Sequence, residues 1–423
     1  MFTRYSKIST AAALCILFSV MPAIVANVSA FSVSSSVNLS NDRFNASYPN
    51  VQNVGNNVYV AWSEGSRGIL FRHSTDGGAT WSANVRLSPT GVGSSQFPLI
   101  AAAGADVYVV WSQGAKTIDV ATSTNNGTSF SPAVIVSGAV PSSITPVIAA
   151  FGNDVYVVWD GNGSSYITFS TNNGATWSSP VQYASGPEPQ VAAYGSSAYA
   201  VADTFSRQNS AVYFTNNNGT TWSRSGSISG AEPWISAYGP NVLVAAESKG
   251  NASVVRLITS TNSGRTFSAV RTLSTSVPNS WAPMTAIFGK TEYVAWRSNP
   301  GSSNSQEYVS VSLNSGATWS TPAAIGVSGR DNSWPVTVAT TSSTAFIAWY
   351  ERTGTSRTAS WQALAVEGTN NGSAWTTPTV LGHSLAESDV ATEAISTNGP
   401  TMFAVWTNTS STGNNQVYFT TGA

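Results

Sequence analysis

Charged residues and cysteine are both scarce in this sequence, and each scarcity excludes a class of function. Lys, Arg, Asp and Glu make up 9% of the 423 residues, and the formal net charge is −1. Nucleic acids and anionic membranes are bound through basic surfaces, so neither partner is expected. The single cysteine, Cys15, lies in an apolar leader. The rest of the chain therefore has no thiol for a disulfide, a zinc site or a nucleophile.

The first thirty residues have the pattern of a secretory signal. Arg4 and Lys7 precede an apolar run, and small residues at Val28 and Ala30 fit a cleavage site. No later stretch is apolar for long enough to span a membrane. We therefore expect residues 1–30 to be removed and residues 31–423 to form one exported domain, secreted or held at the cell surface.

One short motif recurs seven times along the chain. It has the form S-x-D/N-x-G-x-T/S-W/F, and its first copy is STDGGATW, which begins at Ser74. Asp, Asn and Gly favour tight turns, so each copy is predicted to connect two strands. The aromatic residues that end the copies lie 45 to 56 residues apart: Trp81, Phe130, Trp177, Trp222, Phe267, Trp319 and Trp375.

A second pattern, an alternating apolar segment such as VYVAW, recurs eight times. The segments end at Trp62, Trp111, Trp159, Ala202, Ala246, Trp296, Trp349 and Trp406. Each repeat divides into four strands: A, which a Pro is expected to open; B, the apolar segment; C, before the recurring turn; and D, after it. Four-stranded repeats with a period of about 40–50 residues are typical of a β-propeller. The predicted fold is therefore all-β, a single propeller of four-stranded blades.

The blade count follows from the two ends of the chain. The eighth repeat stops after its strand C, and the N-terminal segment SSVNLS (35–40) matches the strand D pattern ANVRLS (83–88). One N-terminal strand would then complete the last blade and close a ring of eight. The alternative is a seven-bladed ring with an additional terminal hairpin.

The recurring turn resembles the Asp-box, or BNR repeat, of the sialidase-like propellers, and the resemblance extends over residues 31–423. It implies that the boxes are turns on the rim, away from the active site of that family. Only the first box has Asp, at Asp76; the other six have Asn, at Asn125, Asn172, Asn217, Asn262, Asn314 and Asn370. Asn preserves a turn but cannot replace the carboxylate of a calcium loop or an acid catalyst. The boxes therefore predict the fold and not a site.

The connections of a four-stranded meander alternate between two faces, so the B–C and D–A loops share the face opposite the boxes. On that face we expect an acidic arc made by Asp160, Glu188, Asp203, Glu232 and Glu247. Ala202 and Ala246, which replace Trp, are expected to leave space beside the arc. The arc could bind ligand hydroxyl groups or Ca²⁺. No other cofactor is expected, and the isolated His73 and His383 predict no metal site.

Across the ring, the same face is predicted to hold a basic and aromatic group. Its members are Arg297, Arg330, Tyr350, Glu351 and Arg352, with Trp281 and Trp334 near the D–A loops. Tryptophan beside polar groups is the usual lining of a sugar site, so the expected partner is a carbohydrate or a cell-surface glycoconjugate.

Two functions are left open. The first is binding of a glycan without catalysis. The second is hydrolysis: the resemblance implies that a sialidase would need three arginines, a Tyr nucleophile with a Glu partner, and an Asp acid. The candidates for the three arginines are Arg43, Arg297 or Arg330, and Arg352. The candidate nucleophile is Tyr350, with Glu247 or Glu351 as its partner. The Arg-Ile-Pro motif of that family is missing from the sequence. Paired carboxylates of the acidic arc would be the other catalytic option.

Overall fold

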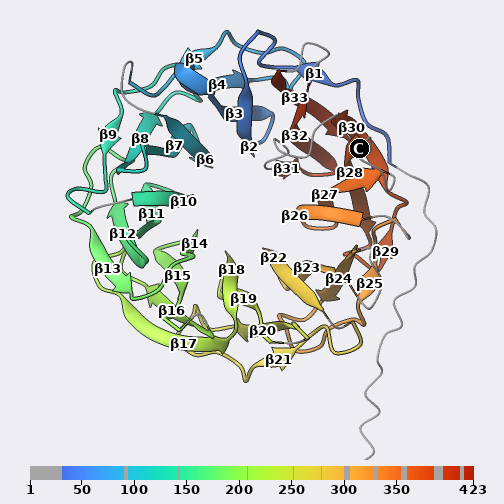
Figure 1. Cartoon of the computed structure of the whole chain (residues 1–423). Coiled ribbons are helices and arrows are strands. Elements are labelled where there is room, and N and C mark those ends of the chain that lie inside the picture. Colours follow the sequence, from blue (N-terminus) through green and yellow to red (C-terminus); the bar gives the residue numbers. More distant parts are fainter. Residues whose placement is uncertain are drawn as a thin grey trace, which may run out of the picture.

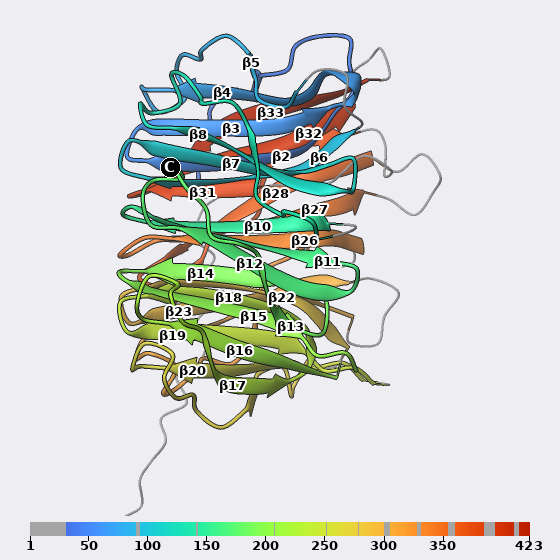
Figure 2. The ribbon, with the colours of Figure 1, turned by 90° about the vertical axis from the view of Figure 1, so that its left-hand side faces the viewer.

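Eight antiparallel sheets stand radially around a common axis in the computed structural model (Figure 1). The structure describes residues 31–89, 94–140, 143–206, 208–250, 252–277, 279–299, 305–327, 331–353, 360–384, 394–409 and 414–423. Each sheet is one blade, and its strands A to D run from the axis outward. Figure 2 shows the ring from its side.

The strands are as follows, in the order A to D. Blade 1 consists of β2 (Ala46–Val54), β3 (Asn57–Glu64), β4 (Gly68–Ser74) and β5 (Val85–Arg86). Blade 2 consists of β6 (Ser95–Ala103), β7 (Asp106–Gln113), β8 (Thr117–Ser123) and β9 (Val134–Ile135). Blade 3 consists of β10 (Ser143–Phe151), β11 (Asp154–Gly161), β12 (Ser164–Ser170) and β13 (Val181–Ala184). Blade 4 consists of β14 (Gln190–Tyr194), β15 (Ser197–Asp203), β16 (Asn209–Thr215) and β17 (Ser223–Ser229).

The second half of the ring continues the pattern. Blade 5 consists of β18 (Ala231–Tyr238), β19 (Asn241–Glu247), β20 (Val255–Ser260) and β21 (Arg271–Thr272). Blade 6 consists of β22 (Ser280–Phe288), β23 (Thr291–Ser298), β24 (Gln306–Ser312) and β25 (Ala323–Ala324). Blade 7 consists of β26 (Asp331–Thr340), β27 (Ala345–Thr353), β28 (Ser360–Thr369) and β30 (Thr379–Ser384); the end of β28 also pairs with β29 (Ala374–Trp375), which belongs to the box. Blade 8 consists of β31 (Ala394–Asn398), β32 (Thr401–Thr409), β33 (Asn415–Gly422) and β1 (Val37–Asn38).

The N-terminal strand closes the ring, which confirms the prediction of eight blades and excludes the seven-bladed alternative. Val37 pairs with Phe419 and Asn38 with Tyr418. The Gln416 side chain strengthens this closure: its Oε1 accepts hydrogen bonds from the Ser40 hydroxyl and the Asp42 amide, both at 3.0 Å. Its Nε2 donates to the carbonyl of Phe44, also at 3.0 Å.

Strand B is buried on both sides because it lies between two neighbouring blades. Side chains alternate along a strand, so successive residues of β3 face opposite blades. Val60 and Trp62 pack with blade 8, whereas Tyr59 and Ala61 pack with Trp111 of blade 2. This double burial explains why strand B is the most apolar segment of each repeat.

The boxes are C–D turns, as predicted, and their hydrogen bonds explain the motif. In blade 1 the Ser74 hydroxyl accepts from the amide of Gly78 at 2.8 Å and donates to Asp76 at 2.7 Å. Asp76 accepts from the amide and hydroxyl of Thr80 at 2.9 and 2.6 Å. These bonds, led by the Thr80 hydroxyl, lower the pKa of Asp76 to about 2.

An Asn at the same place preserves the turn. Asn172 Oδ1 accepts from the Thr176 amide, and its Nδ2 donates to the Thr176 hydroxyl, both at 2.9 Å. The network thus reverses one donor without changing its geometry. The prediction that the carboxylate is dispensable for the turn is confirmed.

The box glycine is required because each box packs on the preceding blade. A Cβ added to Gly78, at φ 91°, would lie 2.3 Å from the ring of Phe419 in blade 8. The corresponding glycines of the other six boxes meet blades 1 to 6 in the same way: Gly127, Gly174, Gly219, Gly264, Gly316 and Gly372.

Three local expectations need correction. The Pro does not open strand A in five blades: β2 begins at Ala46, three residues before Pro49, and the Pro lies in a bulge where no ladder hydrogen bond is needed. Strand D is only two residues long in blades 1, 2, 5, 6 and 8. Blade 7 has an additional two-residue strand, β29, inside its box, whereas β30 lies where strand D was predicted. Among the described residues, no helix is long and apolar enough to span a membrane.

Candidate functional site

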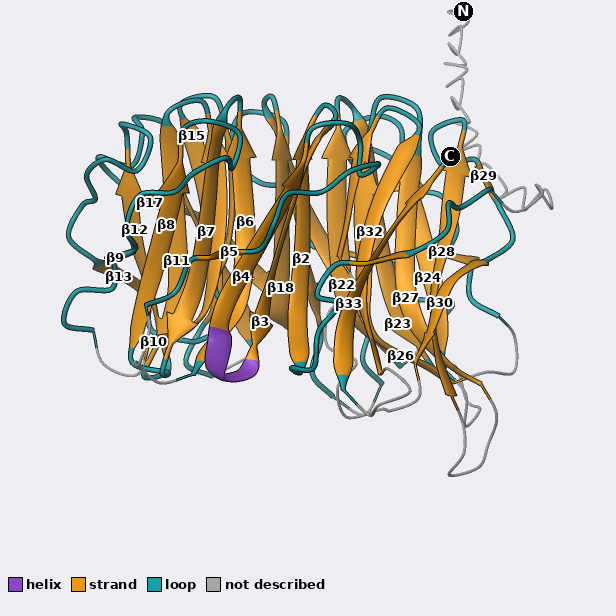
Figure 3. Ribbon diagram, turned by 90° about the horizontal axis from the view of Figure 1, so that it is seen from above, coloured by secondary structure: helices purple, strands orange, loops and turns teal. Residues whose placement is uncertain are grey.

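We call the mouth the end of the ring at which strands A begin and strands B end. The register brings these two segments together: Trp281 pairs with Arg297, and Ala231 with Glu247. The B–C connections lie at this end, where the 3-10 turn Gly65–Arg67 is visible in Figure 3. The boxes lie at the other end.

Blade 5 brings the predicted pair Glu232 and Glu247 together, but with a cation between them. Lys249 Nζ contacts Glu232 Oε1 at 2.8 Å and also pairs with Glu247 Oε1. Partial burial lowers the pKa of Lys249, but the contacts with both glutamates together outweigh it and raise the pKa. The second oxygen of Glu247 accepts a hydrogen bond from the Ala282 amide at 3.0 Å. Both carboxylates are therefore already engaged by the protein.

Blade 6 places an aromatic ring and a guanidinium beside this ion pair. Arg297 lies over the ring of Trp281, with 5.5 Å between the guanidinium carbon and the ring centroid, and donates to the Ser305 hydroxyl at 2.6 Å. Trp281 and Arg297 are both half-buried. Beneath them Glu307 is fully buried, and burial raises the pKa of its carboxyl well above the usual range despite the nearby charge of Arg297.

Blades 3 and 4 use their predicted acidic residues in the local structure. Asp160 accepts a hydrogen bond from the Gly163 amide at 2.8 Å and so stabilises the β11–β12 turn. Asp203 is buried and accepts from the Ser210 hydroxyl at 2.9 Å, whereas Glu188 is exposed. The Asp203 amide bonds the carbonyl of Pro187 at 3.0 Å, so Glu188 and Asp203 belong to neighbouring segments, as expected.

The space expected beside Ala202 and Ala246 is filled, so that expectation is wrong. Both alanines are fully buried. The hydroxyl of Tyr183, from blade 3, donates to the Val201 carbonyl at 3.3 Å, next to Ala202. A Cβ on Gly230 would lie 3.0 Å from that of Ala246. Neighbouring chain segments occupy the places of the missing Trp side chains.

The basic and aromatic group across the ring is only partly assembled. Tyr350 is 0% exposed and packs with Trp361 and Trp406 between blades 7 and 8, which does not favour it as a nucleophile. Glu351 is also fully buried, and Arg352 is half-buried. Arg330 and the side chain of Trp334 lie outside the described residues.

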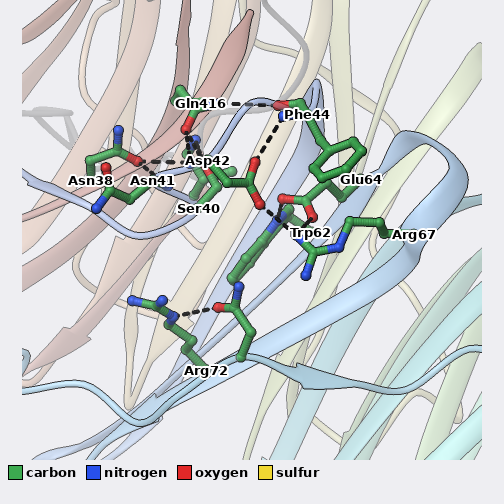
Figure 4. Close-up of polar contacts among 12 residues, drawn as sticks. Asn38, Ser40, Asn41, Asp42, Phe44, Trp62, Glu64, Arg67, Arg72 and Gln416 are labelled. Carbon is green, nitrogen blue, oxygen red and sulfur yellow. Dashed lines mark hydrogen bonds and ion pairs between the residues drawn. The ribbon is translucent and has the colours of Figure 1, made fainter.

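Arg43 lies beside a different cluster, whose members Asp42, Phe44, Glu64 and Arg67 are shown in Figure 4. Its guanidinium and that of Arg67 lie 5.5 and 5.1 Å from the ring centroid of Phe44. Arg67 pairs with Asp42 at 2.5 Å and with the buried Glu64 at 2.9 Å. Burial raises the pKa of Glu64, while the hydrogen bond from Trp62 opposes the shift. The cluster anchors the closure of the ring, and no contact links Arg43 to Arg297 or Arg352 in the part of the chain that the structure describes.

Two residues at this end escaped the sequence analysis. Lys249 lies in a B–C connection, and nothing in its sequence context indicated that it would bridge two glutamates. Phe205 lies between β15 and β16 and is 85% exposed, an unusual exposure for so large an apolar ring. Its position in a B–C loop was the available signal.

Calcium binding at the acidic arc stays a prediction. Across the described ranges, no three His, Cys, Asp or Glu side chains come together as a metal-binding group.

The ring has structural relatives of low sequence identity. No family model and no curated relative matches the chain. A polysaccharide lyase described as an ulvan lyase superposes with a TM-score of 0.53 at 10% identity, over 93% of this chain and 95% of its own. The phage phi92 endosialidase (TM-score 0.47, 10% identity, 93% and 69%) and a Trypanosoma rangeli sialidase (0.39, 10%, 92% and 58%) are more distant. At this identity the likeness to the lyase shows the propeller fold and not its activity.

Proposed function

We propose that this protein is an exported propeller that binds a saccharide at its mouth without transforming it. The observation that carries the proposal is the patch formed by Trp281, Arg297, Lys249 and Glu232 in blades 5 and 6. The patch combines a half-buried indole ring with charged donors and acceptors; three of its residues lie on strands, and Lys249 lies in a B–C connection.

A saccharide needs both kinds of group. The apolar face of a sugar ring packs on an aromatic side chain, and its hydroxyl groups exchange hydrogen bonds with charged side chains, which are stronger than those with neutral ones. The ulvan lyase that shares this fold is named for a polysaccharide, so this architecture accommodates that class of ligand.

Binding is favoured over hydrolysis because the carboxylates have other partners. General acid–base catalysis needs a carboxyl group that reaches the substrate with its proton free to move. Glu247 bonds Lys249 and the Ala282 amide, Glu232 bonds Lys249, and Asp203 is buried against Ser210.

A binding panel with one variant and one control tests the proposal. Residues 31–423 would be titrated against immobilised cello-, manno- and chito-hexaose and sialyllactose. We expect at least one saccharide to bind, and Trp281→Ala to weaken that binding by about tenfold or more, equivalent to about 1.4 kcal/mol. The control is Ile135→Ala, which removes an exposed apolar side chain from the outermost strand of blade 2, whereas the patch lies in blades 5 and 6. Absence of binding, or equal binding by Trp281→Ala, would refute the proposal.

Hydrolysis is tested on the same samples. Each bound saccharide and a fluorogenic sialoside would be incubated with the protein and analysed for released sugar. Release that is abolished by Glu247→Gln or Tyr350→Phe would replace the binding proposal with a glycoside hydrolase.

A further inference from the structure

Six consecutive blades hold the residue before a Pro in the left-handed backbone region. The φ angles are 53° for Tyr48, 57° for Phe97, 46° for Thr145, 59° for Glu188, 52° for Glu232 and 52° for Ala282. Each precedes the Pro near the start of strand A. We call these six residues the pre-proline ring.

This conformation is costly for such residues. A side chain with a Cβ is disfavoured at positive φ, and a following Pro restricts its neighbour toward extended backbone. Asn, Asp and Gly tolerate the region best, yet none of the six positions has one. Strain that recurs in blade after blade is unlike a packing accident and is found where a fold orients side chains for function.

In five of the six blades a bulge of strand A accompanies this conformation; in blade 4 strand A begins only at Gln190, after Pro189. In blade 1, Ser47 pairs with Ser63 and Asn50 with Ala61, so strand A carries one extra residue between them. Blades 2, 3, 5 and 6 show the same shift, and blade 7 has a longer one between Ser333 and Thr337.

In all six blades the two residues of the X-Pro pair differ in exposure. Every Pro of the six is buried, whereas every pre-proline residue is half-buried or exposed. Strand A is the innermost strand of its blade (Figure 1). The Pro therefore serves the packing of the blades, and the preceding side chain is presented at the mouth.

The pre-proline ring has two chemically distinct sectors. Tyr48 and Phe97 contact each other across blades 1 and 2, with 4.5 Å between ring centroids, and form an aromatic sector. Glu188 and Glu232 form an acidic sector in blades 4 and 5. Glu232 pairs with Lys249, which belongs to the patch around Trp281.

From this arrangement we propose that the pre-proline ring is the specificity-determining wall of the saccharide site. A sugar ring packs on Tyr48 and Phe97, and hydroxyl groups of the same chain donate to Glu188 and Glu232. Two carboxylates on one wall disfavour an acidic sugar there, so the ligand is a neutral oligosaccharide. This inference rests on the proposed function and extends its site from blades 5 and 6 to blades 1 and 2.

Paired substitutions at one position separate strain from recognition. Tyr48→Ala and Tyr48→Gly remove the same ring, but only glycine relieves the positive φ. If the backbone of the pre-proline ring is strained for function, Tyr48→Gly has a higher urea midpoint than Tyr48→Ala. Both variants weaken binding of the neutral hexaose that the unmodified protein binds by about tenfold or more. Glu188→Gln weakens the same binding and narrows the preference for the neutral hexaose over sialyllactose.

The matched control lies at the opposite end of the ring. Asn173, in the box of blade 3, also has a φ of 57°. Asn173→Gly is expected to exceed Asn173→Ala in stability, while both bind the hexaose as the unmodified protein does.

The outcomes distinguish this inference from the function on which it rests. Loss of binding in Trp281→Ala but not in the Tyr48 and Glu188 variants overturns the wall and leaves the function standing. A Tyr48→Gly midpoint at or below that of Tyr48→Ala overturns the strain argument, even if binding is lost. Failure of the unmodified protein to bind any hexaose overturns both, and preferential binding of sialyllactose overturns the neutral ligand.

Discussion

Replacing Glu292 with Gln should reduce the decrease in the free energy of unfolding that the protein shows as pH rises. Glu292 begins the apolar segment of blade 6, where most blades have an apolar residue. Its side chain is 0% exposed, and neither carboxyl oxygen has a hydrogen-bond partner among the described residues. Burial is the only cause of its perturbation and raises its pKa from 4.5 to about 8.

The sign and size of the effect follow from that shift. Between pH 4.5 and 8 the unfolded chain releases the proton of Glu292, while the folded protein retains it. The folded state is therefore stabilised relative to the unfolded state below pH 4.5, and this contribution is lost as pH rises through 8. Each pH unit corresponds to about 1.4 kcal/mol, so the whole contribution is about 5 kcal/mol at most.

Urea unfolding at pH 5, 6, 7 and 8 measures the effect. The Gln side chain does not titrate, so Glu292→Gln should lose less stability than the unmodified protein between pH 5 and 8. Ile135→Ala, which changes an exposed side chain and no titratable group, is the control and should leave the slope unchanged. Parallel slopes for the unmodified protein and Glu292→Gln would refute the assignment of a buried, protonated carboxyl group.

Two further substitutions test the closure of the ring. Gly78→Ala should destabilise the protein by about 2 kcal/mol or more, because the new Cβ would meet the Phe419 ring at 2.3 Å and the φ of 91° disfavours alanine. An unchanged urea midpoint would contradict the contact between boxes and preceding blades. Gln416→Ala should cost about 2–4 kcal/mol, because three hydrogen bonds to residues 40–44 are lost in a buried site. Differential scanning calorimetry measures the change, and Gln416→Glu, which cannot donate to Phe44, should lie between Ala and the native residue.

The repeat period made the architecture predictable. Box spacing and the alternating segments defined eight units, and the match of residues 35–40 to strand D identified the closing strand β1. These features are local, so the hydrogen bonds of the motif in one repeat recur in the other repeats. The pairing of β29 inside the box of blade 7 has no counterpart among the described strands of the other repeats, and no pattern in the sequence indicated it.

The site was less predictable because burial at the ends of strand B depends on neighbouring blades. Residues just after the strand B Trp were expected at the mouth, yet Glu64, Tyr350 and Glu351 are fully buried. In blades 1 and 2 the residue two places after the Trp bonds its indole: Trp62 donates to Glu64 and Trp111 to Gln113, both at 3.1 Å. The sequence shows that such a residue is polar, but it does not show which neighbouring group is its hydrogen-bond partner.

The contact of each box with the preceding blade has a consequence for how the molecule comes apart. Repeat proteins that stack in a line have two free ends, from which units can fray one at a time. Here the succession of contacts returns on itself, since Gly78 of the first blade rests on Phe419 of the last. No blade is terminal, and opening any one interface exposes two blade faces at once. We therefore expect loss of order to be a single event for the whole circle rather than a progressive peeling.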